Sequence, residues 1–105
     1  MKLKLNLADR LSLETYLPEE TGLKDLIIKK DILSKTRVTQ DDVLKYDIKD
    51  DGKNTFWNKE GSEAEFEIEF TELEIILLRS SFRNIAEQNK LRMHHLNLAQ
   101  QLINE

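Results

Sequence analysis

The clearest pattern in the chain is a strict alternation of apolar and acidic residues between Ala64 and Phe70. Successive side chains of a β-strand point to opposite faces, so this period predicts a strand with one buried and one acidic face. A shorter alternation of leucine with polar residues at the N-terminus, ending at Leu7, predicts a first strand. An all-helical N-terminus is the alternative.

Three pairs of residues have the spacing of a helix capping box. In such a box the first side chain accepts a hydrogen bond from the backbone N–H three residues later, and the second side chain reaches back. The pairs are Asn6 with Asp9, Thr39 with Asp42, and Thr71 with Glu74. They predict helices that start just after each first member, and the one after Thr39 is short, from Gln40 to about Lys45. Thr21 predicts a further N-cap for a helix to about Ser34.

Apolar residues at helical spacing extend two of these predictions. The helix after Thr71 should reach about Gln88 and bury a stripe that includes Leu78 and Phe82. The spacing of Leu91, His95, Leu98 and Leu102 predicts a last helix.

The middle of the chain changes to a period of two. Leu44, Tyr46 and Ile48 alternate with polar residues, the run Asp50, Asp51, Gly52 supplies a turn, and Thr55, Phe56, Trp57 resume a β-prone segment. This predicts a hairpin, with a second turn at Gly61 and Ser62. The fold class expected is α+β: one domain over residues 1–105, with a small antiparallel sheet of two to four strands flanked by three to five helices, two of them C-terminal.

Composition removes several classes of function. The chain has 105 residues, 16 Lys and Arg against 20 Asp and Glu, and a net charge of −4, so a non-specific nucleic-acid binder is disfavoured. It has no cysteine, which excludes disulfides, thiolate metal sites and cysteine nucleophiles. No apolar run approaches the roughly 20 residues that span a bilayer, and no signal peptide is recognisable, so no membrane and a cytoplasmic location are expected.

The acidic alternation belongs to a longer acidic segment. Residues 60–74 contain seven glutamates and no Lys or Arg, a local charge of −7. Glu63, Glu65, Glu67 and Glu69 would project from one strand face, which suits a row of basic side chains on a protein partner. The alternative is a solvated face that keeps a sheet edge from pairing with other chains. The spacing is too wide for a metal site built from these carboxylates alone.

Other candidate sites are weaker. Arg79 and Arg83 lie one helical turn apart and are a possible anion-binding pair. His94 and His95 are adjacent, so they point about 100° apart on a helix and cannot share a metal from one face; His95 is expected to be a partly buried structural residue. Ser80 and Ser81 lack the glycine elbow of a nucleophile.

A helix-turn-helix over residues 23–46 is a further possibility for nucleic-acid binding. The first helix and the turn carry several basic residues. The second helix would begin with Asp41 and Asp42, which would face bases and phosphates with the wrong charge. This interpretation is therefore disfavoured.

Several landmarks resemble a class of short, largely uncharacterised proteins encoded by bacteriophages and prophages. They are the leucine alternation running into Arg10 and Leu11; Leu17, Pro18, Glu19 with Gly22; Thr39 to Asp42; Gly52; Trp57 with Asn58; and Ile68 to Thr71 leading to Glu74. The resemblance covers most of the chain and implies an accessory protein of a mobile element or its host. It brings no catalytic residue.

The chain shows no nucleophile with a base and an orienting group, no metal cluster and no phosphate loop. We therefore expect a non-enzymatic, cofactor-free protein-interaction module, with a homo-oligomer as an open option. The alternatives are an acidic-face inhibitor of a basic nucleic-acid-binding protein, a weak nucleic-acid-binding regulator, and, least favoured, an enzyme. The regulator would use Lys24, Lys29, Lys30, Arg79 and Arg83. Whether Tyr16, Phe56 and Trp57 are core or exposed surface is left open.

Overall fold

Two strands from opposite parts of the chain form the main sheet. The computed structural model describes residues 1–103, and within them β1 (Lys2–Leu5) pairs antiparallel with β4 (Phe66–Glu69). The register places Lys2 opposite Glu69 and Leu5 opposite Phe66. The predicted strands are confirmed and the all-helical N-terminus is wrong, although the ladder starts two residues later than the alternation.

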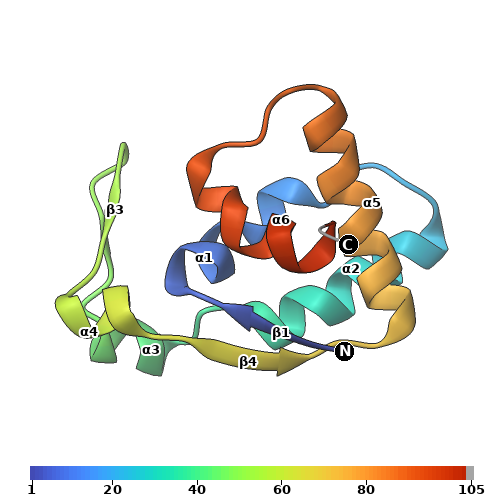
Figure 1. Cartoon of the computed structure of the whole chain (residues 1–105). Coiled ribbons are helices and arrows are strands. Elements are labelled where there is room, and N and C mark those ends of the chain that lie inside the picture. The colour runs from blue at the N-terminus through green and yellow to red at the C-terminus, as the bar shows by residue number, and fades with distance from the viewer. Residues whose placement is uncertain (104–105) are drawn as a thin grey trace.

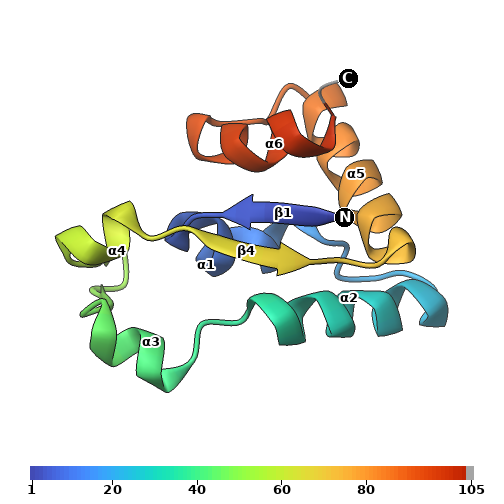
Figure 2. The same cartoon turned by 60° about the horizontal axis from the view of Figure 1, so that its bottom comes forward.

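Helices cover this sheet on several sides. They are α1 (Leu7–Tyr16), α2 (Leu23–Thr36), α5 (Glu72–Glu87) and α6 (Leu96–Leu102), the last preceded by the 3-10 turn η1 (Met93–His95). Figure 2 shows the sheet between α6 and α2, with α5 beside the end from which β4 leads out. We call β1, β4 and these helices the body.

The core of the body forms where the apolar sheet face meets α1, α2, α5 and α6. Leu5 and Phe82 are fully buried, and the ring of Phe82 meets Tyr16 edge to face with centroids 5.1 Å apart. The predicted stripe of α5 is confirmed, because Ile75, Leu78 and Phe82 are buried and Ile85 packs against the same core.

All three predicted capping boxes are present. The side chains of Asn6, Thr39 and Thr71 each accept from the backbone N–H three residues later, and the acid there accepts from the cap backbone. The predicted cap at Thr21 is wrong. Gly22 is the N-cap of α2, and the Thr21 hydroxyl donates to Asp25 at 3.3 Å instead.

The middle of the chain folds into α3 (Gln40–Lys45), β2 (Lys49–Asp50), β3 (Thr55–Phe56) and α4 (Lys59–Glu63). β2 and β3 form the predicted hairpin as a second small antiparallel sheet, and Gly52 supplies the positive φ, 89°. The α+β class is therefore confirmed, with the strands of residues 1–103 in two separate sheets.

Two local predictions in this region are wrong. The short helix predicted from Gln40 to about Lys45 is confirmed as α3, so the strand-like alternation of Leu44 and Tyr46 is wrong. Leu44 belongs to α3, and Tyr46 is its C-cap, because its backbone bond to Asp42 closes the helix. Gly61 lies in α4 and not in a turn, because the side chain of Asn58 accepts from the Gly61 N–H and caps a helix there.

The hairpin stands apart from the helices. Figure 1 shows it rising on one side of the molecule, with α3 and α4 at its foot. We call residues 47–58 the arm: none of its residues is buried, and only Ile48 and Trp57 are partly covered.

Candidate interaction surfaces

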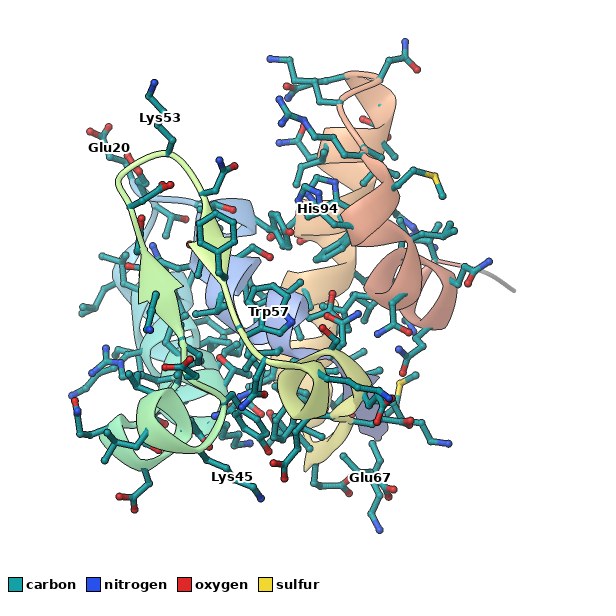
Figure 3. The ribbon with its side chains drawn as sticks, turned by 90° about the vertical axis from the view of Figure 1, so that its left-hand side faces the viewer. Glu20, Lys45, Lys53, Trp57, Glu67 and His94 are labelled. Atoms are coloured by element: carbon teal, nitrogen blue, oxygen red, sulfur yellow. The ribbon has the colours of Figure 1, made fainter. Side chains whose placement is uncertain are left out.

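The predicted acidic face exists, but basic groups of the neighbouring strand line it. Glu65 lies 3.7 Å from the Nζ of Lys4, and Glu67 lies 3.5 Å from the Nζ of Lys2. Glu69 lies 3.7 Å from the N-terminal ammonium. These pairs are diagonal across the β1–β4 ladder, where side chains on one sheet face are within reach of each other. Glu67 projects from the lower rim of the molecule in Figure 3.

The fourth predicted residue, Glu63, is separate from this row. It is the exposed last residue of α4 and forms no ion pair within residues 1–103. The structure thus brings together three of the four glutamates. The local charge of −7 is largely compensated, because Glu60 also approaches Lys45 at 3.9 Å and Glu74 pairs with Lys35.

The ion pair of Lys35 with Glu74 is different in kind, because the carboxylate is 4% exposed. Burial raises the pKa of Glu74, but the hydrogen bonds from Lys35 and from the Thr71 backbone outweigh burial and hold this pKa below its ordinary value. The Nζ of Lys35 also donates to the carbonyl of Glu69 at 3.2 Å. This group therefore connects α2, the end of β4 and the start of α5.

The predicted anion-binding pair lies on the outer face of α5. Arg79 donates from Nε to the carbonyl of Leu102 at 2.7 Å, so its guanidinium already connects α5 to α6. Arg79 and Arg83 line one cavity of about 470 Å³ together with Ile76, Ser80, Asn84 and Glu87. The carboxylate of Glu87 in this cavity opposes the binding of an anion.

The two histidines of the η1 region differ, because His95 is buried and His94 is exposed. His95 is 6% exposed, its Nδ1 accepts from the Arg92 N–H at 2.8 Å, and its ring meets Tyr16 edge to face at 4.4 Å, which confirms the structural role expected of it. Burial, then the nearby His94 and Arg92, lower the pKa of His95. Within residues 1–103 no three His, Cys, Asp or Glu side chains are grouped to hold a metal.

The segment proposed as a helix-turn-helix is held to α1 by an acid. Asp42 of α3 accepts from the Nη2 of Arg10 at 3.0 Å, and Arg10 also donates to the carbonyls of Thr36 and Arg37. Hydrogen bonds from Thr39 and the charge of Arg10 lower the pKa of Asp42. The Asp42 side chain, at the start of the second helix, therefore forms a structural contact with α1.

Asp9 is a buried group that sequence reasoning recognised only as a cap. It is 1% exposed, and its Oδ2 accepts from the Asn6 N–H at 2.9 Å and from the Asn97 amide at 2.7 Å. Its Oδ1 has no hydrogen-bond partner. Burial is the main influence on the pKa of Asp9 and raises it. Only the tertiary contact with α6 shows this, since no local signal marks the residue as buried.

The three aromatic residues left open by the sequence divide between body and arm. Tyr16 is core at 8% exposure, Trp57 is partly buried, and Phe56 is 53% exposed. Register places Phe56 opposite Lys49, so both lie on the arm face opposite to Ile48 and Trp57. In Figure 3 Lys53 lies at the free tip of the arm and Trp57 at its base.

No family model, curated protein or solved structure matches the chain. In residues 1–103 no helix has the length and apolar character to cross a membrane.

Proposed function

We propose that this protein is a non-enzymatic protein-interaction module that contacts its partner through the arm. The observation that carries the proposal is the exposure of the arm. None of its twelve residues, 47–58, is buried, and one of them is a large aromatic residue, Phe56, that is 53% exposed. Large aromatic side chains are enriched at the centres of protein interfaces.

The arm is also presented in a way that suits binding. The end of α3 fixes its base, because Asn58 donates from its backbone to the Tyr46 carbonyl at 2.8 Å and from its side-chain amide to the Lys45 carbonyl. Tyr46 is 5% exposed and meets Phe66 of β4 edge to face. A rigid base reduces the conformational entropy that a partner must remove on binding.

The acidic face gives less support to the inhibitor alternative. Its carboxylates have intramolecular cations as neighbours, so a basic partner would have to displace Lys2, Lys4 and the N-terminal ammonium from them. Exposed ion pairs are weak, about 1 kcal/mol or less each, so such displacement is inexpensive but removes the electrostatic advantage that a bare row of glutamates would offer.

The test compares capture of partners by the wild type and by Phe56→Ser in extracts of cells that express the protein. Leu23→Ser is the matched control, because Leu23 is 74% exposed on α2 of the body. We expect Leu23→Ser to retain the partners that the wild type captures, and Phe56→Ser to lose them while its circular dichroism stays unchanged. Equal capture by both variants would contradict the proposal.

A further inference from the structure

We propose that the arm pairs with the arm of a second copy of this chain, by antiparallel addition of β3 to β3. This inference rests on the proposed function, because it names the partner of the same surface. It follows from a difference between the edges of the two sheets.

The edges of the body sheet are protected. On β1 the backbone N–H and carbonyl of Lys4 are taken by the side chain of Gln101, each at 2.8 Å, and the carbonyl also accepts from Asn97. On β4 the carbonyl of Glu69 accepts from Lys35, and every second residue is a glutamate. Charged side chains and covered backbone groups are the usual means of preventing strand addition.

The edge of β3 has neither protection. Residues 54–58 read Asn-Thr-Phe-Trp-Asn and carry no charge, whereas residues 49–51 on the β2 side read Lys-Asp-Asp. In an antiparallel hairpin with Lys49 paired to Phe56, the N–H and carbonyl groups of Thr55 and Trp57 point away from β2. Within residues 1–103 these groups have no hydrogen-bond partner outside the hairpin.

A second copy fits this edge in a self-complementary register. A two-fold axis at Phe56 places Thr55 opposite Trp57 of the other copy, and each such pair exchanges both of its backbone hydrogen bonds. Phe56 then faces its own counterpart in a pair that is not hydrogen-bonded, where side chains are closest and aromatic pairs stabilise a sheet. The uncharged edge brings no like charges together between residues 54 and 58.

Charge limits the pairing at both ends. Just beyond the paired segment, the same register brings Lys53 at the tip of one arm near Lys59, the first residue of α4, in the other copy. The structure gives neither side chain an ion pair within residues 1–103. Like charges directly opposite each other destabilise strand pairing. The association should therefore be weak and should strengthen as salt screens the two lysines.

The first experiment uses the absence of cysteine in the chain. In Phe56→Cys, the register brings two cysteines together at a pair with Cα atoms about 4.5 Å apart, which a disulfide accepts. We expect mild oxidation to produce covalent dimer about tenfold faster than in Leu44→Cys, because pairing raises the effective concentration of the two thiols. Leu44 is the control, since it is 73% exposed on α3 near the foot of the arm. Phe56→Cys keeps the backbone edge at Thr55 and Trp57 but loses the ring pair, whereas the charge variants below keep Phe56. Equal rates together with equal association constants in those variants would overturn the proposal.

The second experiment is a charge cycle read by analytical ultracentrifugation of the full chain. Lys53→Glu or Lys59→Glu alone should raise the association constant about tenfold at low salt, because each puts opposite charges at both ends of the pairing. The double variant should return to the wild-type value. Lys30→Glu on α2 changes the net charge equally and should do little. An equal constant in all four variants would overturn the proposal.

The two proposals fail in different ways. If the cysteine and charge variants show no pairing but Phe56→Ser still loses its captured partners, the arm binds a different protein and only the self-pairing is wrong. If Phe56→Ser also retains every partner, the proposed function fails as well.

Discussion

Phe82 in the body and Phe56 in the arm are the same residue type in opposite surroundings, and their exposure shows how the two regions differ. Phe82 is 0% exposed inside the core, whereas Phe56 is 53% exposed on a hairpin of two short strands. Buried aromatic area stabilises the fold, and an exposed aromatic ring is available to a partner. The difference separates the region that stabilises the fold from the region that we propose for binding.

The largest effect should come from Phe82. We expect Phe82→Ala to lower the free energy of unfolding by about 3–5 kcal/mol, because it leaves a cavity among Tyr16, His95 and the core leucines. Urea denaturation followed by circular dichroism measures this. A loss below about 1 kcal/mol would mean that this part of the body is not close-packed.

The second prediction concerns the acidic face. Replacing Glu65, Glu67 and Glu69 with Lys should lower the free energy of unfolding by about 2 kcal/mol, because it puts like charges against Lys2, Lys4 and the N-terminal ammonium. The same three positions changed to Gln should lose about 1 kcal/mol or less. Added salt should reduce the loss in the Lys variant, and a loss independent of salt would contradict this account.

The third prediction tests how the arm joins the body. A Cβ at Gly61 would lie 2.9 Å from the Cδ1 of Trp57 and 3.2 Å from the Cδ2 of Leu7. We expect Gly61→Ala to lower the free energy of unfolding by about 1 kcal/mol, since overcrowding outweighs the higher helix propensity of alanine in so short a helix. The emission of Trp57, the single tryptophan, should shift to longer wavelength. Gly22→Ala, with no atom within 4 Å of the added Cβ, is the control.

Sequence reasoning succeeded where the determining contacts are local. The capping boxes at Asn6, Thr39 and Thr71 act over three residues, and they were placed correctly from spacing alone. It failed at Tyr46, where an apolar period of two was compatible with a strand but the preceding cap had already started a helix.

The candidate site depended on contacts between distant residues. The lysines of β1 and the glutamates of β4 both recur at every second residue, and this shared period is the signal that would have paired the two strands. The strands lie far apart in the sequence, however, and nothing local shows that they are neighbours. Each segment considered by itself therefore looked charged. The exposure of Phe56 was equally inaccessible, because an aromatic β-prone segment has the same sequence pattern in a core and on an arm.

The fourth prediction uses the raised pKa of Asp9. The folded state holds the proton more tightly than the unfolded chain, so this group contributes stability below its ordinary pKa of 3.8, and that contribution is lost as pH rises through the raised value. Asp9→Asn removes the titration. The free energy of unfolding of the variant, minus that of the wild type, should therefore increase as pH rises from 3.8 through the raised pKa of Asp9.

His95→Asn is the matched control, with the opposite sign. Because the pKa of His95 is lowered, its contribution is present above the ordinary value of 6.5 and is lost as pH falls toward the lowered value. The difference between this variant and the wild type should increase as pH falls. Parallel pH profiles for Asp9→Asn and the wild type would show that Asp9 is not held in a buried environment.

The smallest effect on stability should come from Phe56. We expect Phe56→Ala to change the free energy of unfolding by about 0.5 kcal/mol or less. The reason is that Phe56 is 53% exposed and that none of residues 47–58 is buried. The measurement is the same urea denaturation as for Phe82→Ala, at low protein concentration. If the arms pair, the free energy of unfolding of the wild type should rise with protein concentration, because association stabilises the folded state by mass action. The difference between the wild type and Phe56→Ala would then grow with concentration. A large loss at every concentration would mean that the arm packs as part of the body, and the separation of stability from binding would then be wrong.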